Sequence, residues 1–247
     1  LKVRVRGMFP SSGSLQFIPT DLVEQAQRRE LFADETYAPL VIGVDVARYG
    51  DNESVIFPRI GNDCRSWPAR RFVGLNTVQL VGKVIEQVRE FKSRGINCSG
   101  LFVDGGGVGG GVIDQLADLG YNPKEVQFGS KAVNQKTYRY RSDEMWGNMR
   151  DALPRLCLPA NNQKNGSDLL ADLTQREFGY TASGNRIHLE TKKDMMARGV
   201  PSPDLADALA LTFALPVAPL RYPAGHMAEV PVVQSEYDPL NPPIMSV

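Results

Sequence analysis

Two aspartates of this sequence stand where a buried strand is expected to end. Asp45 follows the apolar run 40–44, and Asp104 follows the apolar run 101–103. Apolar runs of this kind are typical of central strands that are buried on both faces. Ligands bind at the carboxyl edge of an open α/β sheet, so the two carboxylates would converge there if their strands are neighbours. An acid at a strand end is also a common turn residue, so neither aspartate is decisive alone.

Two more aspartates lie at the start of the last helical segment. Ser202 stands at the expected N-cap and Pro203 at the first helical position, directly before Asp204. Asp207 follows one turn later on nearly the same helix face. Capping and the helix dipole explain an acid at this position without any catalytic role. The combination with the two strand-end aspartates is what predicts a functional site.

Carboxylates gathered in this way need a counter-charge. Two unit charges about 4 Å apart repel by about 4 kcal/mol at an effective dielectric near 20, so one acid must be protonated or a cation must bind. A ligand set of oxygen atoms without His or Cys suits Mg²⁺ or Mn²⁺ better than zinc. Two such ions about 3.5–4 Å apart would clamp a phosphodiester. The acids therefore indicate a two-metal phosphodiester hydrolase.

The hydrophobic pattern predicts the elements that would position these acids. We expect three strands, then helix, strand, helix and strand, over 40–45, 54–60, 66–73, 78–91, 101–104, 112–119 and 125–128. Asn76 or Thr77 is the expected N-cap of the first of these helices, and Gly95 its stop. This βββαβαβ order predicts an α/β fold with a ribonuclease H-like mixed central sheet that is flanked by helices.

Further elements are expected on either side of this core. A short helix is expected over 21–32 and another around 145–153, where Pro154 ends it. Segments 178–181 and 186–189 flank Ala182-Ser183-Gly184-Asn185 and predict an extra β-hairpin. The last helix is expected to run toward Pro216, and a Pro-rich flexible tail to follow it.

Composition limits the classes of partner. Lys and Arg together number 28 among 247 residues, as do Asp and Glu, so DNA contact must come from a local basic patch. The three scattered cysteines form no CxxC pair and argue against both a disulfide framework and a zinc ribbon. No apolar run approaches the roughly 18–20 residues of a membrane span, and the N-terminus lacks a signal-peptide pattern.

Three segments of the chain resemble the nuclease domain of phage terminase large subunits. They are VDVARYGDNES (44–54), VDG (103–105) and, most specifically, KKDMMARGVPSPDLADAL (192–209). The stretch from GMFP (7–10) to Ile18-Pro19 resembles the connector that leads out of that family's ATPase domain. The resemblance therefore implies a connector over 1–37, a nuclease domain over 38–216 and a tail over 217–247. No G-x-x-x-x-G-K-[ST] motif is present, so we interpret the chain as an excised nuclease domain without a nucleotide-binding site.

The resemblance also implies roles for residues and partners. It assigns the catalytic metal ligands to Asp45, Asp104 and Asp204, with Asp207 as an auxiliary ligand or a residue behind them. Lys192 or Lys193 would lie close to the metals. The expected activity is cutting of concatemeric double-stranded DNA during genome packaging in the host cell cytoplasm. The expected partners are double-stranded DNA, the portal protein and the small terminase subunit.

Two groups of basic residues could bind DNA phosphates. Arg139 and Arg141 precede one expected helix, while Lys192, Lys193 and Arg198 precede the helix that carries the acids. Charged loops are as often merely solvated. A lone histidine such as His188, in the expected hairpin, could relay a proton, although most such residues are structural, and His226 lies in the tail.

Other functions compete for the same residues. The glycines of 105–110 satisfy G-x-G-x-x-G after a strand, but the three-strand start is wrong for a dinucleotide-binding fold, and Asp104 would face the pyrophosphate. An actin-like or sugar-kinase-like phosphotransferase shares the βββαβα core, yet it needs a second such domain. A non-catalytic docking module of the packaging motor would keep the fold without needing the acids.

Overall fold

The computed structural model describes residues 15–31, 38–47, 53–182 and 185–218. Five strands form one mixed sheet in the spatial order β3-β2-β1-β4-β5. β1 pairs antiparallel with β2 and parallel with β4, β2 pairs antiparallel with β3, and β4 pairs parallel with β5. The bounds are β1 Leu40–Asp45, β2 Glu53–Ile60, β3 Arg70–Val73, β4 Cys98–Asp104 and β5 Pro123–Val126. The predicted βββαβαβ order is confirmed, and the two aspartate-bearing strands, β1 and β4, are neighbours.

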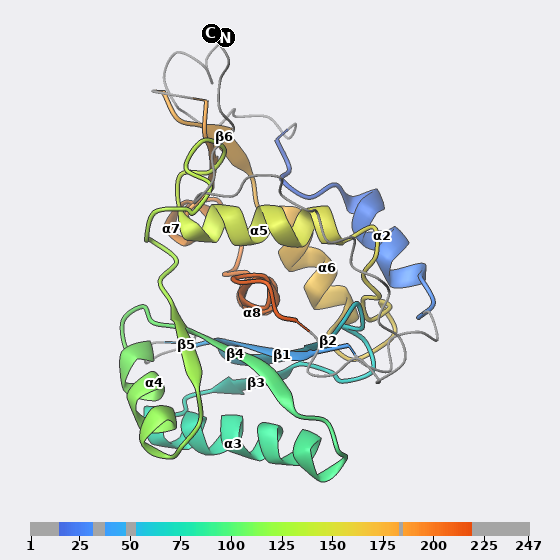
Figure 1. Cartoon of the computed structure of the whole chain (residues 1–247). Coiled ribbons are helices and arrows are strands. Elements are labelled where there is room, and N and C mark those ends of the chain that lie inside the picture. The colour runs from blue at the N-terminus through green and yellow to red at the C-terminus, as the bar shows by residue number, and fades with distance from the viewer. Residues whose placement is uncertain (1–14, 32–37, 48–52, 183–184, 219–247) are drawn as a thin grey trace, which may run out of the picture.

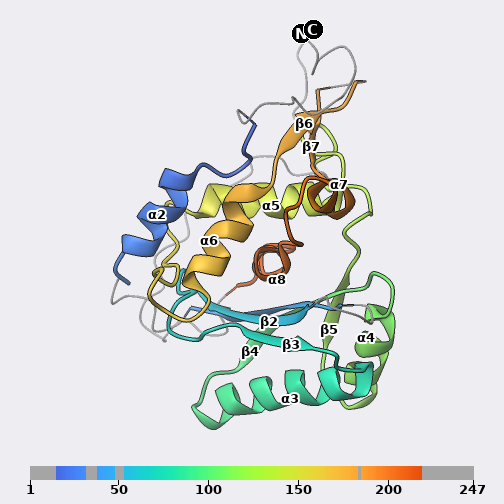
Figure 2. The same ribbon diagram turned by 180° about the vertical axis from the view of Figure 1, so that it is seen from behind.

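Helices cover both faces of the sheet (Figures 1 and 2). One face is covered by α3 and α4, and the other by α8, with α5, α6 and α2 packed outside α8. Their bounds are α2 Thr20–Arg28, α3 Thr77–Ser93, α4 Gly109–Asp118, α5 Arg141–Ala152, α6 Gly166–Gln175 and α8 Asp204–Leu211. Side chains alternate between the faces along each strand, so one sheet serves two separate hydrophobic cores.

The ends of α3 follow the expected chemistry. Asn76 is the N-cap, and its side chain accepts a hydrogen bond from the N–H of Gln79 at 2.8 Å, while the Gln79 side chain accepts from the N–H of Asn76 at 3.0 Å. Gly95 adopts a positive φ of 79° just beyond the helix, which glycine permits without steric cost. The predicted start and stop of this helix are therefore confirmed.

Several bounds differ from the expectation. β3 is confined to its last four residues, and β5 begins at Pro123 rather than Glu125, because its register with β4 runs from Leu101↔Pro123 to Asp104↔Val126. The N-cap of α8 is Pro203, not Ser202. α8 also ends early, since Arg59 donates hydrogen bonds to the hydroxyl and carbonyl oxygens of Thr212 at 2.9 and 2.8 Å.

Further elements lie outside the core order. The predicted hairpin is confirmed as β6 Phe178–Tyr180 and β7 Ile187–Leu189. Helices α6 and α7 (Lys192–Ala197) were not expected. Within the predicted connector, the side chains of Phe17, Ile18 and Val23 are buried in the core on the α8 side. The tail beyond residue 218 and residues 48–52 of the first resembling segment lie outside the described residues, and the domain boundaries stay predictions.

A glycine lets α8 lie directly on the central strand. A Cβ atom at Gly43 would stand 2.0 Å from the carbonyl oxygen of Ala208, far inside van der Waals contact. Gly43 lies on the same face of β1 as Val41 and Asp45, and this is the face that α8 covers. The absence of a side chain here therefore determines how closely the helix that bears Asp204 approaches the strand that bears Asp45.

We expect Gly43→Ala to lower the free energy of unfolding by about 1–3 kcal/mol, because the added methyl group must push α8 away from β1. Urea denaturation of both proteins measures this difference. Gly82→Ala is the matched control, since a Cβ there meets nothing within 4 Å in the exposed face of α3. That change should leave stability unchanged or raise it slightly. Equal stability of Gly43→Ala and the unmodified protein would contradict the close contact.

Candidate active site

Asp45 and Asp104 end neighbouring parallel strands on the face that α8 covers. Val44 pairs with Val103 in the last register position, so the two aspartates stand side by side at the carboxyl edge. Phe102 lies in the core on the α8 side, and the alternation of side chains along β4 places Asp104 on that same side. The strands that carry Asp45 and Asp104 are therefore neighbours, as the convergence of the two carboxylates requires.

The first turn of α8 adds Asp204 and Asp207 to this edge. Asp204 is the first residue of the helix, and its Oδ1 accepts a hydrogen bond from the Ser202 hydroxyl at 2.5 Å. Asp207 is fully buried. Serine, which was expected to cap the helix, thus orients the carboxylate of Asp204 instead.

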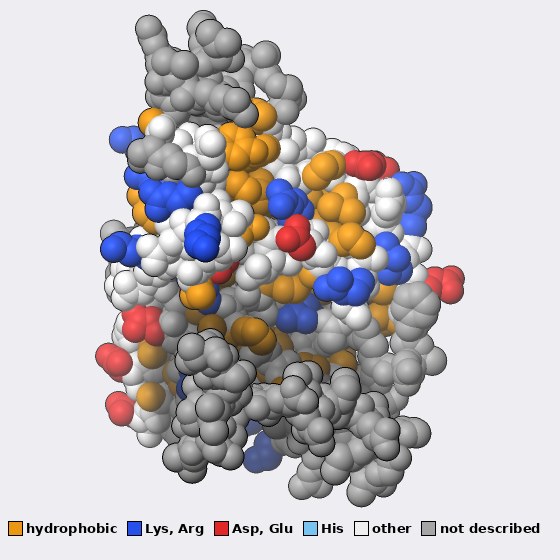
Figure 3. Space-filling model, turned by 45° about the horizontal axis from the view of Figure 1, so that its top comes forward, with side chains coloured by type: hydrophobic (Ala, Val, Ile, Leu, Met, Phe, Trp, Pro, Cys, Tyr) orange, Lys and Arg blue, Asp and Glu red, His pale blue; other side chains and the backbone are white. Residues whose placement is uncertain are grey.

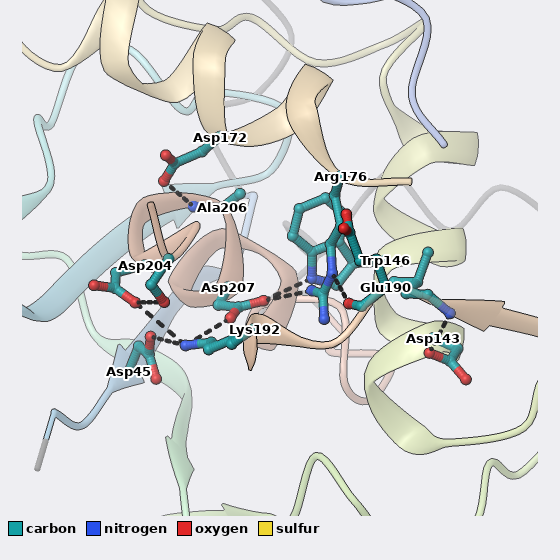
Figure 4. A network of polar contacts seen from close by, with 12 residues as sticks. Asp45, Asp143, Trp146, Asp172, Arg176, Glu190, Lys192, Asp204, Ala206 and Asp207 are labelled. Atoms are coloured by element: carbon teal, nitrogen blue, oxygen red, sulfur yellow. Dashed lines mark hydrogen bonds and ion pairs between the residues drawn. The ribbon is translucent and has the colours of Figure 1, made fainter. Parts of the chain in front are cut away.

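Lys192 lies between the acids from β1 and those from α8 (Figure 4). Its Nζ is 3.4 Å from Asp45 Oδ2, 3.2 Å from Asp204 Oδ1 and 2.9 Å from Asp207 Oδ2. The lysine is the first residue of α7, whose N-cap Thr191 accepts a hydrogen bond from the N–H of Asp194. The resemblance left the choice between Lys192 and Lys193, and the structure places Lys192 among the carboxylates and Lys193 at an exposed position.

The electrostatics of the site follow from burial and these ion pairs. Burial raises the pKa of Asp45 to about 8; Lys192 opposes this rise, and Asp207 and Asp204 add to it. Burial also raises the pKa of Asp104, although the N–H of Gly106 donates to its Oδ1 at 2.9 Å and opposes the shift. Burial would lower the pKa of Lys192, but the three aspartates outweigh it and hold that pKa well above 10.5.

Asp207 is fixed from behind by two donors. Trp146 Nε1 donates to its Oδ1 at 2.8 Å, and Arg176 Nη1 donates to the same oxygen at 3.1 Å. Arg176 also stacks over the Trp146 ring and donates to the carbonyl of Glu190 at 3.0 Å. Burial works to raise the pKa of Asp207, but Lys192 and Arg176 outweigh it and hold the pKa below its ordinary value. Asp207 therefore has one oxygen held by Trp146 and Arg176 and the other paired with Lys192 at 2.9 Å.

Asp172 caps α8 from another helix. The N-cap residue Pro203 has no side-chain acceptor, and Asp172 Oδ2 on α6 accepts from the N–H of Leu205 at 3.0 Å and of Ala206 at 3.3 Å instead. These are orphan donors of the first helical turn. Burial raises the pKa of Asp172 to about 7 against those two hydrogen bonds. Asp172 therefore fixes the turn from which Asp204 projects.

The acids open into a cleft of about 440 Å³. Its lining includes Asp45, Asp104, Asp204 and Lys192, together with residues of the β7 strand and the start of α5. Of the predicted phosphate-binding residues, Arg139 stacks on the cleft-lining Tyr140. Two others lie elsewhere: Arg141 pairs with Glu144 at 2.6 Å, and Arg198 pairs with Glu190 at 2.7 Å.

The donor set suits a hard divalent cation. Asp45, Asp104 and Asp204 offer carboxylate oxygens at one edge, and the Lys192 ammonium already stands among them as a cation. Within the described residues, no three His, Cys, Asp or Glu side chains are yet gathered closely enough to hold an ion. The residue types fit Mg²⁺ or Mn²⁺, and Lys192 occupies the space between the carboxylates in this structure.

The residues that support the site were harder to find in the sequence than the acids. Asp172 and Arg176 lie on or directly after α6, which was not predicted. Leu169, Leu170 and Leu173 at helical spacing, after Asn165-Gly166, were the signal for that helix. Trp146 was identified only as part of a helix, since nothing in its neighbourhood indicates that its indole meets Asp207.

Comparison with known proteins identifies the fold. The sequence matches no family model and no curated protein. The nuclease domain of the large terminase subunit gp2 of bacterial virus Sf6 matches with a TM-score of 0.65 at 19% identity, over 82% of this chain and 100% of that domain. A mutant of that domain with manganese and beta-thujaplicinol gives 0.67 at 17% identity, with the same coverage. The large terminase nuclease from thermophilic phage G20c with bound magnesium gives 0.52 at 16% identity, over 80% and 97%.

These structural neighbours are nuclease domains of phage large terminase subunits, so the predicted resemblance is confirmed at the level of the fold. The predicted ribonuclease H-like α/β sheet is confirmed with it. Of the helices in the described residues, none is long and apolar enough to cross a membrane.

We expect Asp172→Ala to lower the free energy of unfolding by about 1–2 kcal/mol, the usual effect of removing a helix cap. Asp172→Asn should lose much less, because an amide oxygen can accept the same two hydrogen bonds. Urea denaturation measures both variants. A loss in Asp172→Asn as large as that in Asp172→Ala would mean that the charge, rather than the cap, supports α8.

Stability in EDTA should depend on pH through Asp45. Its folded pKa of about 8 lies above the ordinary 3.8, so the folded protein binds the proton more tightly. The stability that this proton contributes is complete below about pH 4 and is lost as the pH rises to about 8. Asp172, whose pKa is raised to about 7, and Asp104, whose pKa is also raised, contribute within the same window in both proteins, whereas the shifts of Asp207 and Lys192 act below pH 3.8 and above pH 10.5. Denaturation between about pH 5 and 8 should therefore give a flatter pH dependence for Asp45→Asn than for the unmodified protein.

Proposed function

We propose that this chain is a divalent-metal-dependent endonuclease that cuts concatemeric double-stranded viral DNA during genome packaging. One observation carries the proposal: three aspartates from β1, β4 and α8 meet in one cleft, in a chain whose fold is that of phage terminase nuclease domains. Magnesium, manganese and calcium accompany several of those neighbours in their structures. The proposed partners are double-stranded DNA, the portal protein and the small terminase subunit, in the cytoplasm of the infected cell.

In this proposal, Asp45, Asp104 and Asp204 hold Mg²⁺ or Mn²⁺, most simply as two ions. The ions supply an activated water and neutralise charge on the phosphodiester that is cut. Asp45 must give up its proton to act as a ligand, and its raised pKa indicates that this step is coupled to cation binding. Asp207 stays bound to Trp146 and Arg176 and is a positioning residue for Lys192 rather than a ligand.

Lys192 has two roles in the proposed reaction. Before cation binding, its ammonium relieves repulsion among Asp45, Asp204 and Asp207. With cations bound, the Lys192 side chain would be free to bind a phosphate oxygen of the DNA, and its ion pair with Asp207 would limit how far it moves. Arg139, which stacks on the cleft-lining Tyr140, is the second proposed phosphate contact. The predicted contacts of Lys193, Arg141 and Arg198 stay predictions at positions outside the lining of the cleft.

We expect Asp45→Asn and Asp104→Asn each to lower the rate of cutting at least about 100-fold, because each removes a charge that would hold the cations. The measurement is conversion of supercoiled plasmid to nicked and linear forms with Mn²⁺, Mg²⁺ or EDTA. Asp118→Asn is the matched control, since it removes an exposed carboxylate outside the lining of the cleft. Full activity of either aspartate variant would remove the ligand assignment.

A measurement without DNA separates metal binding from cutting. Mn²⁺ should raise the melting temperature of the unmodified protein and leave that of Asp45→Asn almost unchanged. A thermal shift without any cutting would favour a docking module of the motor that has kept its cations. ATP binding without cutting would instead favour the kinase-like alternative.

A further inference from the structure

The turn from β4 into α4 is rich in glycine, and the fold itself requires most of these glycines. A Cβ atom at Gly105 would overlap the side chain of Glu125 on β5, and one at Gly109 would overlap the carbonyl oxygen of Asp104. Gly107 has a positive φ of 61°, which glycine adopts without steric cost. Packing and backbone conformation therefore account for these three positions.

Gly106 has no such reason within the fold. Its φ lies outside the left-handed region that favours glycine, and the residue is exposed. A Cβ atom there would stand 3.2 Å from Oδ1 and 3.3 Å from Oδ2 of Asp104, and the three atoms nearest to it would all belong to that carboxyl group. A side chain at position 106 would therefore lie directly against an acid of the proposed cation site.

The Asp104 carboxylate has little freedom to move away from such a side chain. Its Oδ1 accepts a hydrogen bond from the N–H of Gly106 at 2.9 Å, so the residue that would carry the new atom also holds the acid. Burial is already the largest cause of the raised pKa of Asp104, and a methyl group would remove further water from its charged form. Asp104 and Gly106 both line the cleft, so the bare backbone at Gly106 leaves this side of the carboxylate open to it.

The charge of the cleft makes access to this carboxylate important. The lining cations Lys192 and Arg176 both pair with the buried Asp207. On the face shown in Figure 3, Lys and Arg side chains lie in small groups between hydrophobic ones rather than in one continuous basic surface. A DNA phosphate in the cleft therefore depends on added cations to offset the acids. Among the described residues, the acids that line the cleft are Asp45, Glu53, Asp104, Asp143 and Asp204.

We propose that Gly106 is a specificity-determining position of the cation site: the absence of a side chain leaves room at the Asp104 carboxylate for a small cation that keeps its bound water. Mg²⁺ demands near-octahedral geometry and usually retains several waters, whereas Ca²⁺ accepts variable numbers and directions of oxygen ligands. An added methyl group therefore disfavours Mg²⁺ more than Ca²⁺. The inference rests on the proposed function and adds to it a reason for the choice of cation.

The test compares cation binding by Gly106→Ala, Gly110→Ala and the unmodified chain in the absence of DNA. The rise in melting temperature over a series of Mg²⁺ or Ca²⁺ concentrations gives an apparent Kd for each cation. Gly110→Ala is the matched control, because a Cβ there meets nothing within 4 Å and the residue lies outside the lining of the cleft. Urea denaturation in EDTA measures whether either change alters the stability of the fold without cations.

We expect Gly106→Ala to raise the apparent Kd for Mg²⁺ about tenfold, the lower end of the usual effect of changing a neighbour of a metal ligand. The apparent Kd for Ca²⁺ should rise less, and Gly110→Ala should leave both values unchanged. Stability of Gly106→Ala in EDTA should stay close to that of the unmodified chain. In the plasmid assay, Gly106→Ala should need more Mg²⁺ for half-maximal cutting and should recover activity at high Mg²⁺.

An unchanged Kd for Mg²⁺ in Gly106→Ala, with clear Mg²⁺ binding by the unmodified chain, would overturn the inference and leave the nuclease proposal intact. Equal losses of Mg²⁺ and Ca²⁺ affinity would also overturn it, because they would reflect a general distortion of the turn. No thermal response of the unmodified chain to either cation would overturn the cation site itself, and with it the proposed metal-dependent cutting.

Discussion

The contact between α8 and β1 at Gly43 is the constraint on which the site depends. The sheet by itself aligns Asp45 and Asp104 along its edge. The helix must lie against the bare backbone of β1 before its first turn can bring Asp204 beside them, and a side chain at position 43 would prevent this. The same close packing takes Asp45 out of water, and this burial is the main cause of its raised pKa.

Charge is the second constraint, and it is balanced in layers. The inner layer consists of the buried Asp207 and the two side chains that donate hydrogen bonds to it, Trp146 and Arg176. The outer layer is Lys192, which is partly exposed and bound to its neighbours by hydrogen-bonded ion pairs. Buried pairs resist change because breaking them leaves an uncompensated charge, whereas an exposed lysine exchanges partners easily. The rigid part of the site therefore lies deep in the protein, and the adaptable part faces the cleft.

The sequence predicted the acids and the order of the core elements because both depend on local patterns. An apolar run that ends in Asp marks the edge of a buried strand wherever it occurs, and the helical period of α3 is unambiguous. The supporting residues were not predictable in this way, because Asp172, Arg176 and Trp146 act through contacts between distant segments. The shift of β5 and the early end of α8 likewise follow from strand register and from Arg59, which no local pattern encodes.

Helix α8 is also the last helix of the described residues, and this has a consequence for how the protein is made. The ribosome releases β1 and β4 long before α8, so the sheet face that α8 covers must wait for it with Val41, Val55 and Phe57 exposed to solvent or to chaperones. Until then, Asp204 has not been added to the chain. A nascent chain, or one cut short before residue 204, therefore lacks both its second core and its complete set of acids. Under the proposed function, a chain that ends before residue 204 would therefore lack one of the three proposed cation ligands.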